Sequence, residues 1–284
     1  MSRALASRWL CLLLALLMLA ACSRLELAYR NLDRLIPWRL DDYLSLDRAQ
    51  RDWLDARLDE HMRWHCRNEL PRYLDWLERQ RPLLAGSPSP ADLEAPLGES
   101  RSLLQPTLAR IAPDAARLLA GLSAAQVDEL EENLLRERNR LHARYLGRAP
   151  AERLQRRVER AQRRLEDWLG PLHPQQRAYL RQWALRQDAN VAPWLANRAH
   201  WQTLLLAQLR AAPRDNLATR LEPLLSSPER YWEADYRRAV SDGQQALAEL
   251  LSELWASSTR AQRQHLDRRL DSLRGDLAGL PCRD

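Results

Sequence analysis

The sequence predicts an all-α protein, and three features of the chain support that prediction. Apolar residues recur at helical spacing almost throughout; between residues 232 and 254 they keep steps of three and four over about six turns. No stretch alternates apolar and polar residues as a half-buried strand does. Glycine occurs 8 times in 284 residues, too rarely for a turn-rich β protein. We expect an irregular bundle of about seven to nine amphipathic helices, several of them long and kinked.

The first residues have the pattern of an export signal rather than of a membrane helix. Arg3 and Arg8 supply positive charge, and residues 9–18 form an apolar run that contains six leucines. A helix of about 10 residues spans only ~15 Å, about half of a ~30 Å hydrocarbon core. We therefore expect residues 1–21 to be a signal peptide and residues 22–284 to be a single helical domain in the periplasm.

The apolar run ends in Leu19, Ala20, Ala21 and Cys22. This tetrad resembles the lipobox of bacterial lipoproteins, in which small side chains flank the cut and the cysteine thiol receives the lipid. The resemblance implies cleavage before Cys22, acylation of Cys22 with chains such as palmitate, and attachment to a lipid bilayer. The alternative is a secreted protein in which a cysteine happens to follow a small-residue cleavage site.

Two features near Cys22 bear on where the body of the protein sits. Ser23 is not the aspartate that often retains such lipoproteins at the inner membrane, so the outer membrane is favoured by analogy. A helical apolar pattern begins at Leu25, three residues after Cys22, and leaves no flexible polar tether. We expect the folded body to lie against the membrane and to face the periplasm.

The net charge of +6 does not indicate a nucleic-acid partner. The arginines alternate with acidic residues, as between residues 153 and 167, instead of forming one basic tract. An exported protein also rarely meets nucleic acid. All 44 basic residues are arginine and phenylalanine is absent, which is typical of biased genomic base composition rather than of a function.

Of the four cysteines, Cys66 and Cys282 remain once Cys11 is cleaved off and Cys22 is acylated. Cys66 falls on an apolar stripe with Leu58 and Leu70 and is expected to face the core. The two thiols either form a disulfide, which the oxidising periplasm favours and which would contribute ~4–5 kcal/mol by chain entropy, or stay apart as one buried and one exposed thiol.

Proline and glycine mark several expected helix boundaries. Ser89-Pro90 and Ser227-Pro228 each have the pattern of an N-cap followed by proline in the first turn, and Gly147 and Gly170 that of helix ends. Pro71 and Pro193 are expected to kink or break their helices. The stretch 81–98, which contains four prolines and two glycines, is the best candidate for a loop or linker.

Four helix starts share a short pattern that ends in glutamine. In three of them Asp, Ser or Thr precedes the glutamine by three residues, which is a capping box. These starts resemble the Leu-Thr-x-x-Gln signature of small helical periplasmic chaperones of the envelope stress response, although those proteins are shorter. Ordinary capping without a shared function is the alternative. The four copies are residues 46–50, 122–126, 172–176 and 258–262.

A longer stretch resembles an uncharacterised proteobacterial lipoprotein family. The resemblance implies an all-helical lipoprotein over the whole mature chain and no catalytic activity, since that family has no assigned one. The matching segments are residues 22–33, Ile36-Pro37-Trp38, Asp41-Asp42-Tyr43 and residues 69–73.

His61, His65 and Glu69 are the strongest candidates for chemistry. Spacings of four place them on one helical face, where two imidazoles and a carboxylate can hold Zn²⁺. The His-Glu-x-x-His signature is absent because Met62 stands where the glutamate is needed. A polar stripe beside the core is the alternative. With no phosphate loop, nucleophile elbow or Cys-x-x-Cys, we expect no enzyme activity and no cofactor.

Three functions remain open at this point. The first is a non-enzymatic, chaperone-like envelope factor that binds an unfolded client or a protein partner in apolar grooves between its helices. The second is a structural lipoprotein of the membrane surface without a client. The third is a metal-dependent enzyme that uses His61, His65 and Glu69.

Overall fold

The structure is a computed structural model, and it describes residues 24–280 and 282. The predicted signal peptide at 1–21 and the predicted lipid-bearing Cys22 lie outside these residues. The described residues form helices and contain no strand, which confirms the all-α prediction. The helices are α2 (Arg24–Arg30), α3 (Leu32–Leu40), α4 (Arg48–Ala85), α5 (Pro90–Ser102), α6 (Gln105–Ala120), α7 (Ala124–Tyr145), α8 (Pro150–Leu169), α9 (Pro174–Arg186), α10 (Val191–Arg210), α11 (Leu217–Ser226), the 3₁₀ helix η1 (Pro228–Tyr231), α12 (Ala234–Ala256) and α13 (Arg260–Ala278).

The described chain has more helical segments than the seven to nine expected, because short breaks divide continuous runs. Asn31 alone separates α2 from α3, and Leu103 and Leu104 separate α5 from α6. None of the described helices is long and apolar enough to cross a bilayer.

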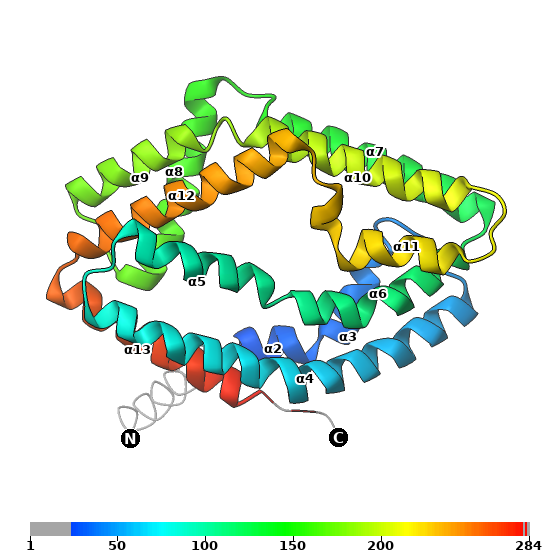
Figure 1. Cartoon of the computed structure of the whole chain (residues 1–284), viewed down its shortest axis with the longest axis horizontal. Helices are drawn as coiled ribbons and strands as arrows, with labels where there is room; N and C mark the ends of the chain where they lie inside the picture. The colour runs from blue at the N-terminus through cyan, green and yellow to red at the C-terminus, as the bar shows by residue number, and fades with distance from the viewer. Residues whose placement is uncertain (1–23, 281, 283–284) are drawn as a thin grey trace, which may run out of the picture.

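The helices form a closed circuit of packed neighbours, visible as the elongated outline in Figure 1. Contacts run from α4 to α6, then to α11, α10, α12, α9, α8 and α13, and α13 returns to α4. Helix α5 packs on α12, and α7 packs on α10. Helices α2 and α3 lie outside this circuit, against α13 and α4 respectively. The last helix of the chain therefore closes the body on its first long helix.

Two apolar cores lie at opposite ends of the circuit. One core lies where α4 and α7 begin and is built on leucines such as Leu122, Leu209 and Leu221. The other lies where α9 and α13 begin and contains Leu180, Leu250 and Leu254. A smaller cluster around Cys66, Leu70 and Leu280 joins α4 to the end of the chain. Burial at the two ends stabilises the helix starts that meet there.

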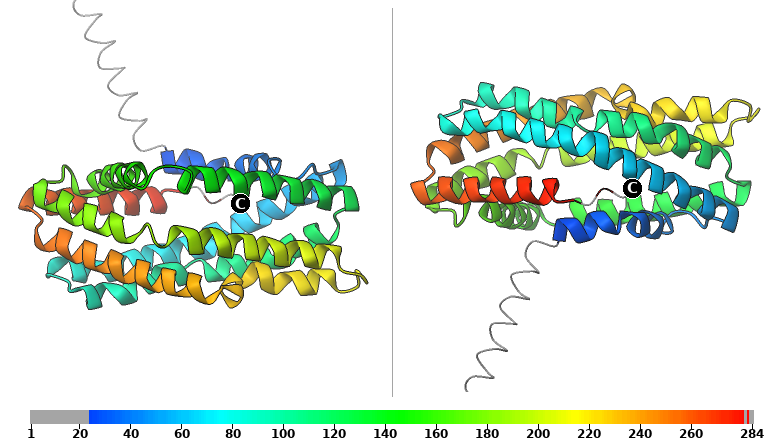
Figure 2. Two further views of the ribbon diagram at one scale, coloured as in Figure 1. Left: turned by 90° about the horizontal axis from the view of Figure 1, so that it is seen from above. Right: turned by 90° about the horizontal axis from the view of Figure 1, so that it is seen from below.

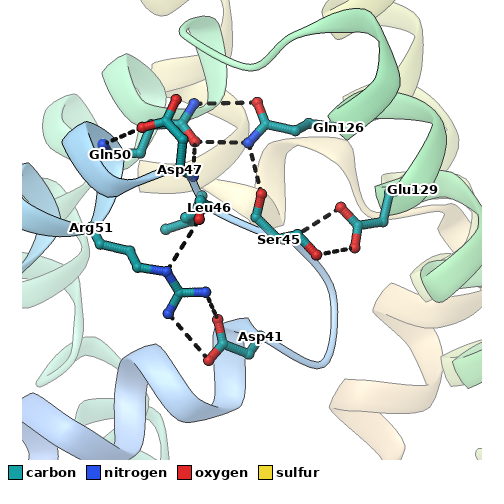
Figure 3. A network of polar contacts seen from close by, with 8 residues as sticks. All are labelled: Asp41, Ser45, Leu46, Asp47, Gln50, Arg51, Gln126 and Glu129. Carbon is teal, nitrogen blue, oxygen red and sulfur yellow. Dashed lines mark hydrogen bonds and ion pairs between the residues drawn. The ribbon is translucent and has the colours of Figure 1, made fainter.

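The four glutamine motifs pair two by two, one pair at each end of the body. At the first end, the Gln50 and Gln126 side-chain amides donate to each other at 3.2 and 2.7 Å (Figure 3). Each glutamine also caps its own helix by accepting from the backbone of Asp47 or Ser123 at 3.0 Å. Gln126 further donates to the Ser45 carbonyl at 2.9 Å. These capping boxes therefore join α4 to α7 as well as starting them.

At the opposite end, Gln176 and Gln262 form the same arrangement between α9 and α13. Their amides donate to each other at 3.2 and 2.9 Å, and both side chains are buried. Gln262 also donates to the Pro171 carbonyl at 2.9 Å. His173, which departs from the Ser/Thr pattern, instead places its ring nitrogen 3.0 Å from the Ser257 carbonyl.

Several boundary predictions are confirmed. Ser89 caps α5, with Pro90 in the first turn. Helix α7 ends just before Gly147 and α8 ends at Leu169. Gly170 terminates α8 with φ of 79°, a left-handed conformation that favours glycine. Ser227-Pro228 begins the 3₁₀ helix η1 instead of an α-helix.

The expected loop at 81–98 is wrong over most of its length. Helix α4 continues to Ala85 and α5 begins at Pro90, so only residues 86–89 lie outside a helix. Trp255 and Ser252 of α12 donate to carbonyls of this short connection, at Gly86 and Pro88. Packing of α5 against α12 thus overrides the weak helix propensity of this stretch.

Proline also interrupts the helices less than expected. Pro71 lies inside the 38-residue α4 without ending it. Pro193 falls in the first turn of α10, where its missing N–H costs no hydrogen bond.

Candidate functional site

An open pocket of the described chain has an aromatic lining, and we call it the aromatic groove. Its volume is about 730 Å³, within the range of small-ligand and side-chain sites. It lies where α5, α12, the end of α7, the start of α8 and the α9–α10 junction converge. Its aromatic residues are Tyr145, Trp183, Trp194, Trp232 and Tyr236.

Two edge-to-face ring pairs shape the aromatic groove. Tyr145 and Trp194 lie 5.2 Å apart between ring centroids, and Trp232 and Tyr236 lie 5.0 Å apart. Burial raises the pKa of the Tyr236 hydroxyl, so this side chain is neutral at physiological pH. Fixed aromatic faces offer a large apolar contact area with little conformational entropy to lose.

Amide side chains supply the polar part of the lining. Asn190 donates to the Gln187 amide oxygen at 3.1 Å, at the junction of α9 and α10. Gly243 of α12 lies directly opposite; a Cβ there would come 3.3 Å from the Asn190 amide nitrogen, so glycine permits this close approach. The Gln187 amide nitrogen and the Trp183 indole N–H are buried and have no hydrogen-bond partner among the described residues. Each is a donor that an acceptor in the groove can satisfy after a side-chain rotation.

An ion-pair network holds the groove wall at the α9–α10 junction. Asp188 pairs with Arg153 at 2.7 Å and with Arg157 at 2.8 Å, and both arginines come from α8. Arg157 also donates to the Ala184 carbonyl at 3.0 Å. The hydrogen bond from Arg153 is the main cause that lowers the pKa of Asp188 to about 2. The carboxylate is therefore charged at any pH the protein is expected to meet.

The aromatic groove continues into a second hollow of about 580 Å³. The two share Arg101, Trp232, Val240 and Gln244, and the extension adds charged side chains such as Glu94 and Arg237. Arg101 bonds to Gln244, and Gln244 donates to the Glu94 carbonyl at 3.0 Å. The lining of the combined surface is aromatic in the first hollow and mixed in charge in the second.

The predicted metal ligands His61, His65 and Glu69 do lie on α4, but each bonds to a different partner. His65 sits between two tyrosines, with Nδ1 3.1 Å from the Tyr29 hydroxyl and Nε2 3.3 Å from the Tyr73 hydroxyl. Burial lowers the pKa of His65, which favours the neutral ring. His65 therefore fastens α2 to α4.

His61 and Glu69 point to other elements. The Nε2 of His61 lies 2.9 Å from the Asp114 carboxylate of α6. Glu69 is buried and pairs with Arg72 at 2.6 Å. Within residues 24–280 and 282 there is no group of three or more side chains of ligand type positioned to hold a metal ion. The arrangement agrees better with the polar-stripe interpretation of these residues.

Cys66 and Cys282 form a disulfide in the structure, with 5.5 Å between their Cα atoms. Cys66 is buried on α4, and the bond ties the end of the chain to the first long helix across 216 residues. No catalytic or ligand-binding role follows from this bond, because it lies in the apolar cluster with Leu70 and Leu280.

The sequence analysis did not identify the aromatic groove. Its residues come from six helices and two connections, and each falls on an ordinary helical stripe when seen alone. The tryptophans give no local signal either, because Trp183, Trp194 and Trp232 are spread over 50 of the 284 residues.

Residues 42–237 match the model of a family of unknown function, DUF6279. No curated protein and no solved structure matches the chain.

Proposed function

Because the chain belongs to DUF6279, a family of unknown function, we propose a role from the aromatic groove. We propose that the protein is a membrane-anchored envelope lipoprotein that binds polypeptide segments and catalyses no reaction. The observation that carries the proposal is the aromatic groove together with the adjoining hollow of mixed charge.

The shape and chemistry of the groove support an extended polypeptide as the ligand. The aromatic end accepts an apolar side chain, and the amides of Gln187, Asn190 and Gln244 match the donors and acceptors of a peptide backbone. The Arg157 guanidinium already pairs with the Asp188 carboxylate, whereas Arg101 bonds to the neutral Gln244 amide and keeps its full charge. Mixed charge along the extension suits a peptide better than a uniformly apolar ligand.

The envelope location rests on the sequence. The tetrad Leu19, Ala20, Ala21 and Cys22 supports acylation at Cys22 by its resemblance to a lipobox, and Ser23 favours the outer membrane. Labelling cells with radioactive palmitate tests this part alone. We expect label on the chain and none on the Cys22→Ser variant; a labelled variant, or an unlabelled wild type, contradicts it.

The binding role is tested with the chain reconstituted in vesicles and a chemically denatured client protein. We expect near-stoichiometric suppression of client aggregation, and loss of that suppression in Trp194→Ser, which removes one aromatic wall of the groove. Leu185→Ser is the matched control, because Leu185 is 54% exposed on α9 and does not line the groove. Circular dichroism checks that both variants remain helical.

Two outcomes contradict the binding role. Absence of suppression with several different clients favours a structural lipoprotein without a client. Equal loss of suppression in Trp194→Ser and Leu185→Ser shows that the aromatic groove is not the binding site.

The enzyme alternative has its own test. A metal-dependent activity that disappears in His61→Ala and His65→Ala favours that alternative.

A further inference from the structure

Helices α2 and α3 hold an unusual share of the exposed apolar surface. Four of the eight large apolar side chains that are exposed in the described chain lie in these two short helices. Trp38 is 66% exposed and Leu27 is 61% exposed, and Leu35 and Ile36 accompany them at 43% and 39%. We call these four residues the α2–α3 face. Water-exposed tryptophan and leucine at this density mark an interaction surface.

The α2–α3 face points outward from helices that are firmly attached on their other side. Tyr29 bonds to His65 of α4, and its ring packs with the cluster around Cys66 and Leu70. Leu40, at the end of α3, packs against the core at the first end of the body. Both views in Figure 2 show α2 and α3 on the outer surface of the body. The face is therefore a built surface and not a frayed end.

Exposed arginines border the α2–α3 face. Arg30, Arg34 and Arg39 lie in the same two helices and are exposed, and Arg30 and Arg39 pair with Glu26 and Asp42. At a bilayer surface, arginine is attracted to anionic headgroups, and tryptophan favours the interfacial zone. Arginine can keep its charge among the headgroups while its stem lies along the apolar side. The composition of the face thus fits the boundary between water and lipid.

The position of the face in the chain indicates which surface covers it. Helix α2 begins at Arg24, two residues after the proposed lipid-bearing Cys22. Two residues span at most about 7 Å, so acyl chains on Cys22 hold α2 at the level of the headgroups. An apolar face at the level of the headgroups lies next to the lipid, which is therefore its nearest apolar partner.

We propose that α2 and α3 lie along the membrane surface, with the side chains of the α2–α3 face inserted between the lipid headgroups. The proposal rests on the membrane anchoring under "Proposed function" and adds an orientation to it. Helices α5 and α12, two walls of the aromatic groove, lie on the opposite side of the body from α2 and α3 in both views of Figure 2. With α2 and α3 on the bilayer, helices α5 and α12 lie on the side of the body away from the lipid.

The test uses tryptophan quenching in vesicles of phosphatidylethanolamine and phosphatidylglycerol with brominated acyl chains. The full chain is reconstituted as the wild type, as Trp38→Leu and as Trp194→Leu. We expect bromine to quench the wild type, and Trp38→Leu to lose that quenched component. Trp194→Leu, which changes a groove tryptophan, should retain it. In the Trp38→Leu background, Leu27→Trp should restore the quenched emission.

The palmitate experiment shows whether Cys22 is acylated. The quenching experiment shows whether the α2–α3 face inserts into the bilayer. If removing Trp38 lowers the quenched emission no more than removing Trp194, and Leu27→Trp adds none, the face does not insert and the proposal is overturned. That result is also the one expected if another protein covers the face.

Discussion

Gln176 and Gln262, which lie 86 residues apart, donate side-chain amide hydrogen bonds to each other in the interior of the protein. Each also accepts from the backbone N–H that precedes its own helix, so the same two side chains start α9 and α13 and join them. Gln50 and Gln126 repeat this relationship between α4 and α7 at the other end of the body.

The first prediction concerns this buried pair. Gln176→Leu leaves one N–H of the buried Gln262 amide without an acceptor, since the other N–H donates to Pro171, and an unsatisfied buried polar group costs about 1–3 kcal/mol. We expect Gln176→Leu to lower the free energy of unfolding by about that amount, measured by urea denaturation. Gln175→Leu is the control, because Gln175 is the exposed neighbour on the same helix.

The double variant of Gln176 and Gln262 separates the energy of the hydrogen bonds between the two amides from the effects of each substitution alone. If the two amides interact as described, Gln176→Leu with Gln262→Leu costs less than the sum of the two single variants. Strict additivity would show that the pair contributes nothing beyond its two separate caps.

These motifs also show how far the sequence alone can predict the structure. A capping box is local: Ser123 and Gln126 lie three residues apart, and their spacing predicts the helix start. The pairing of one box with another is long-range, and nothing in either pentapeptide specifies its partner. The same limit applies to the aromatic groove, since Trp194 and Trp232 lie on different elements. For residues 90–98 the local signals conflict: Ser89-Pro90 predicts a helix start, whereas the proline and glycine content favours a loop, and the packing on α12 that decides for the helix is not visible in local composition.

The second prediction concerns the disulfide between Cys66 and Cys282. It closes a loop of 216 residues, for which the chain-entropy model gives a contribution of roughly 5 kcal/mol to stability. We expect a reducing agent to lower the urea midpoint of the wild type strongly. In Cys66→Ser the midpoint should already be low and should not change on reduction. A wild type that is insensitive to reductant under denaturing conditions would contradict the bond.

The third prediction concerns acid stability at the groove wall. The pKa of Asp188 is lowered from 3.8 to about 2, chiefly by Arg153. Because the folded-state pKa lies below the unfolded value, this carboxylate stabilises the fold fully above pH 3.8 and loses its contribution as the pH falls through about 2. Asp188 is partly exposed, so we expect only about 1 kcal/mol after allowance for solvent screening.

Asp188→Asn removes this titration. The variant should be less stable than the wild type at pH 6, and the difference should shrink towards pH 2 in thermal unfolding followed by circular dichroism. A difference that stays constant with pH would show that Asp188 acts through shape or amide bonding rather than through its charge.

The fourth prediction concerns His65, whose hydrogen bond with Tyr29 holds α2 against α4. Burial lowers the pKa of His65 below 6.5, while the charge of Glu69 partly opposes the shift. The folded state therefore binds a proton less readily than the unfolded state, so the neutral ring stabilises the fold above pH 6.5 and this contribution is lost as the pH falls through the lowered pKa. We expect the wild type to lose more stability than His65→Gln between pH 7.5 and pH 5.5.

His61 is shifted in the same direction by burial, but it is present in both proteins, so its contribution cancels in the comparison. Tyr29→Phe gives a second measurement: it removes the hydroxyl 3.1 Å from His65 and should increase hydrogen–deuterium exchange in α2 while leaving α9 unchanged. Because α2 carries Leu27, the same variant should also weaken the quenching of a Leu27→Trp reporter by brominated lipid. Unchanged exchange in α2 would show that the Tyr29–His65 bond does not hold this helix to α4.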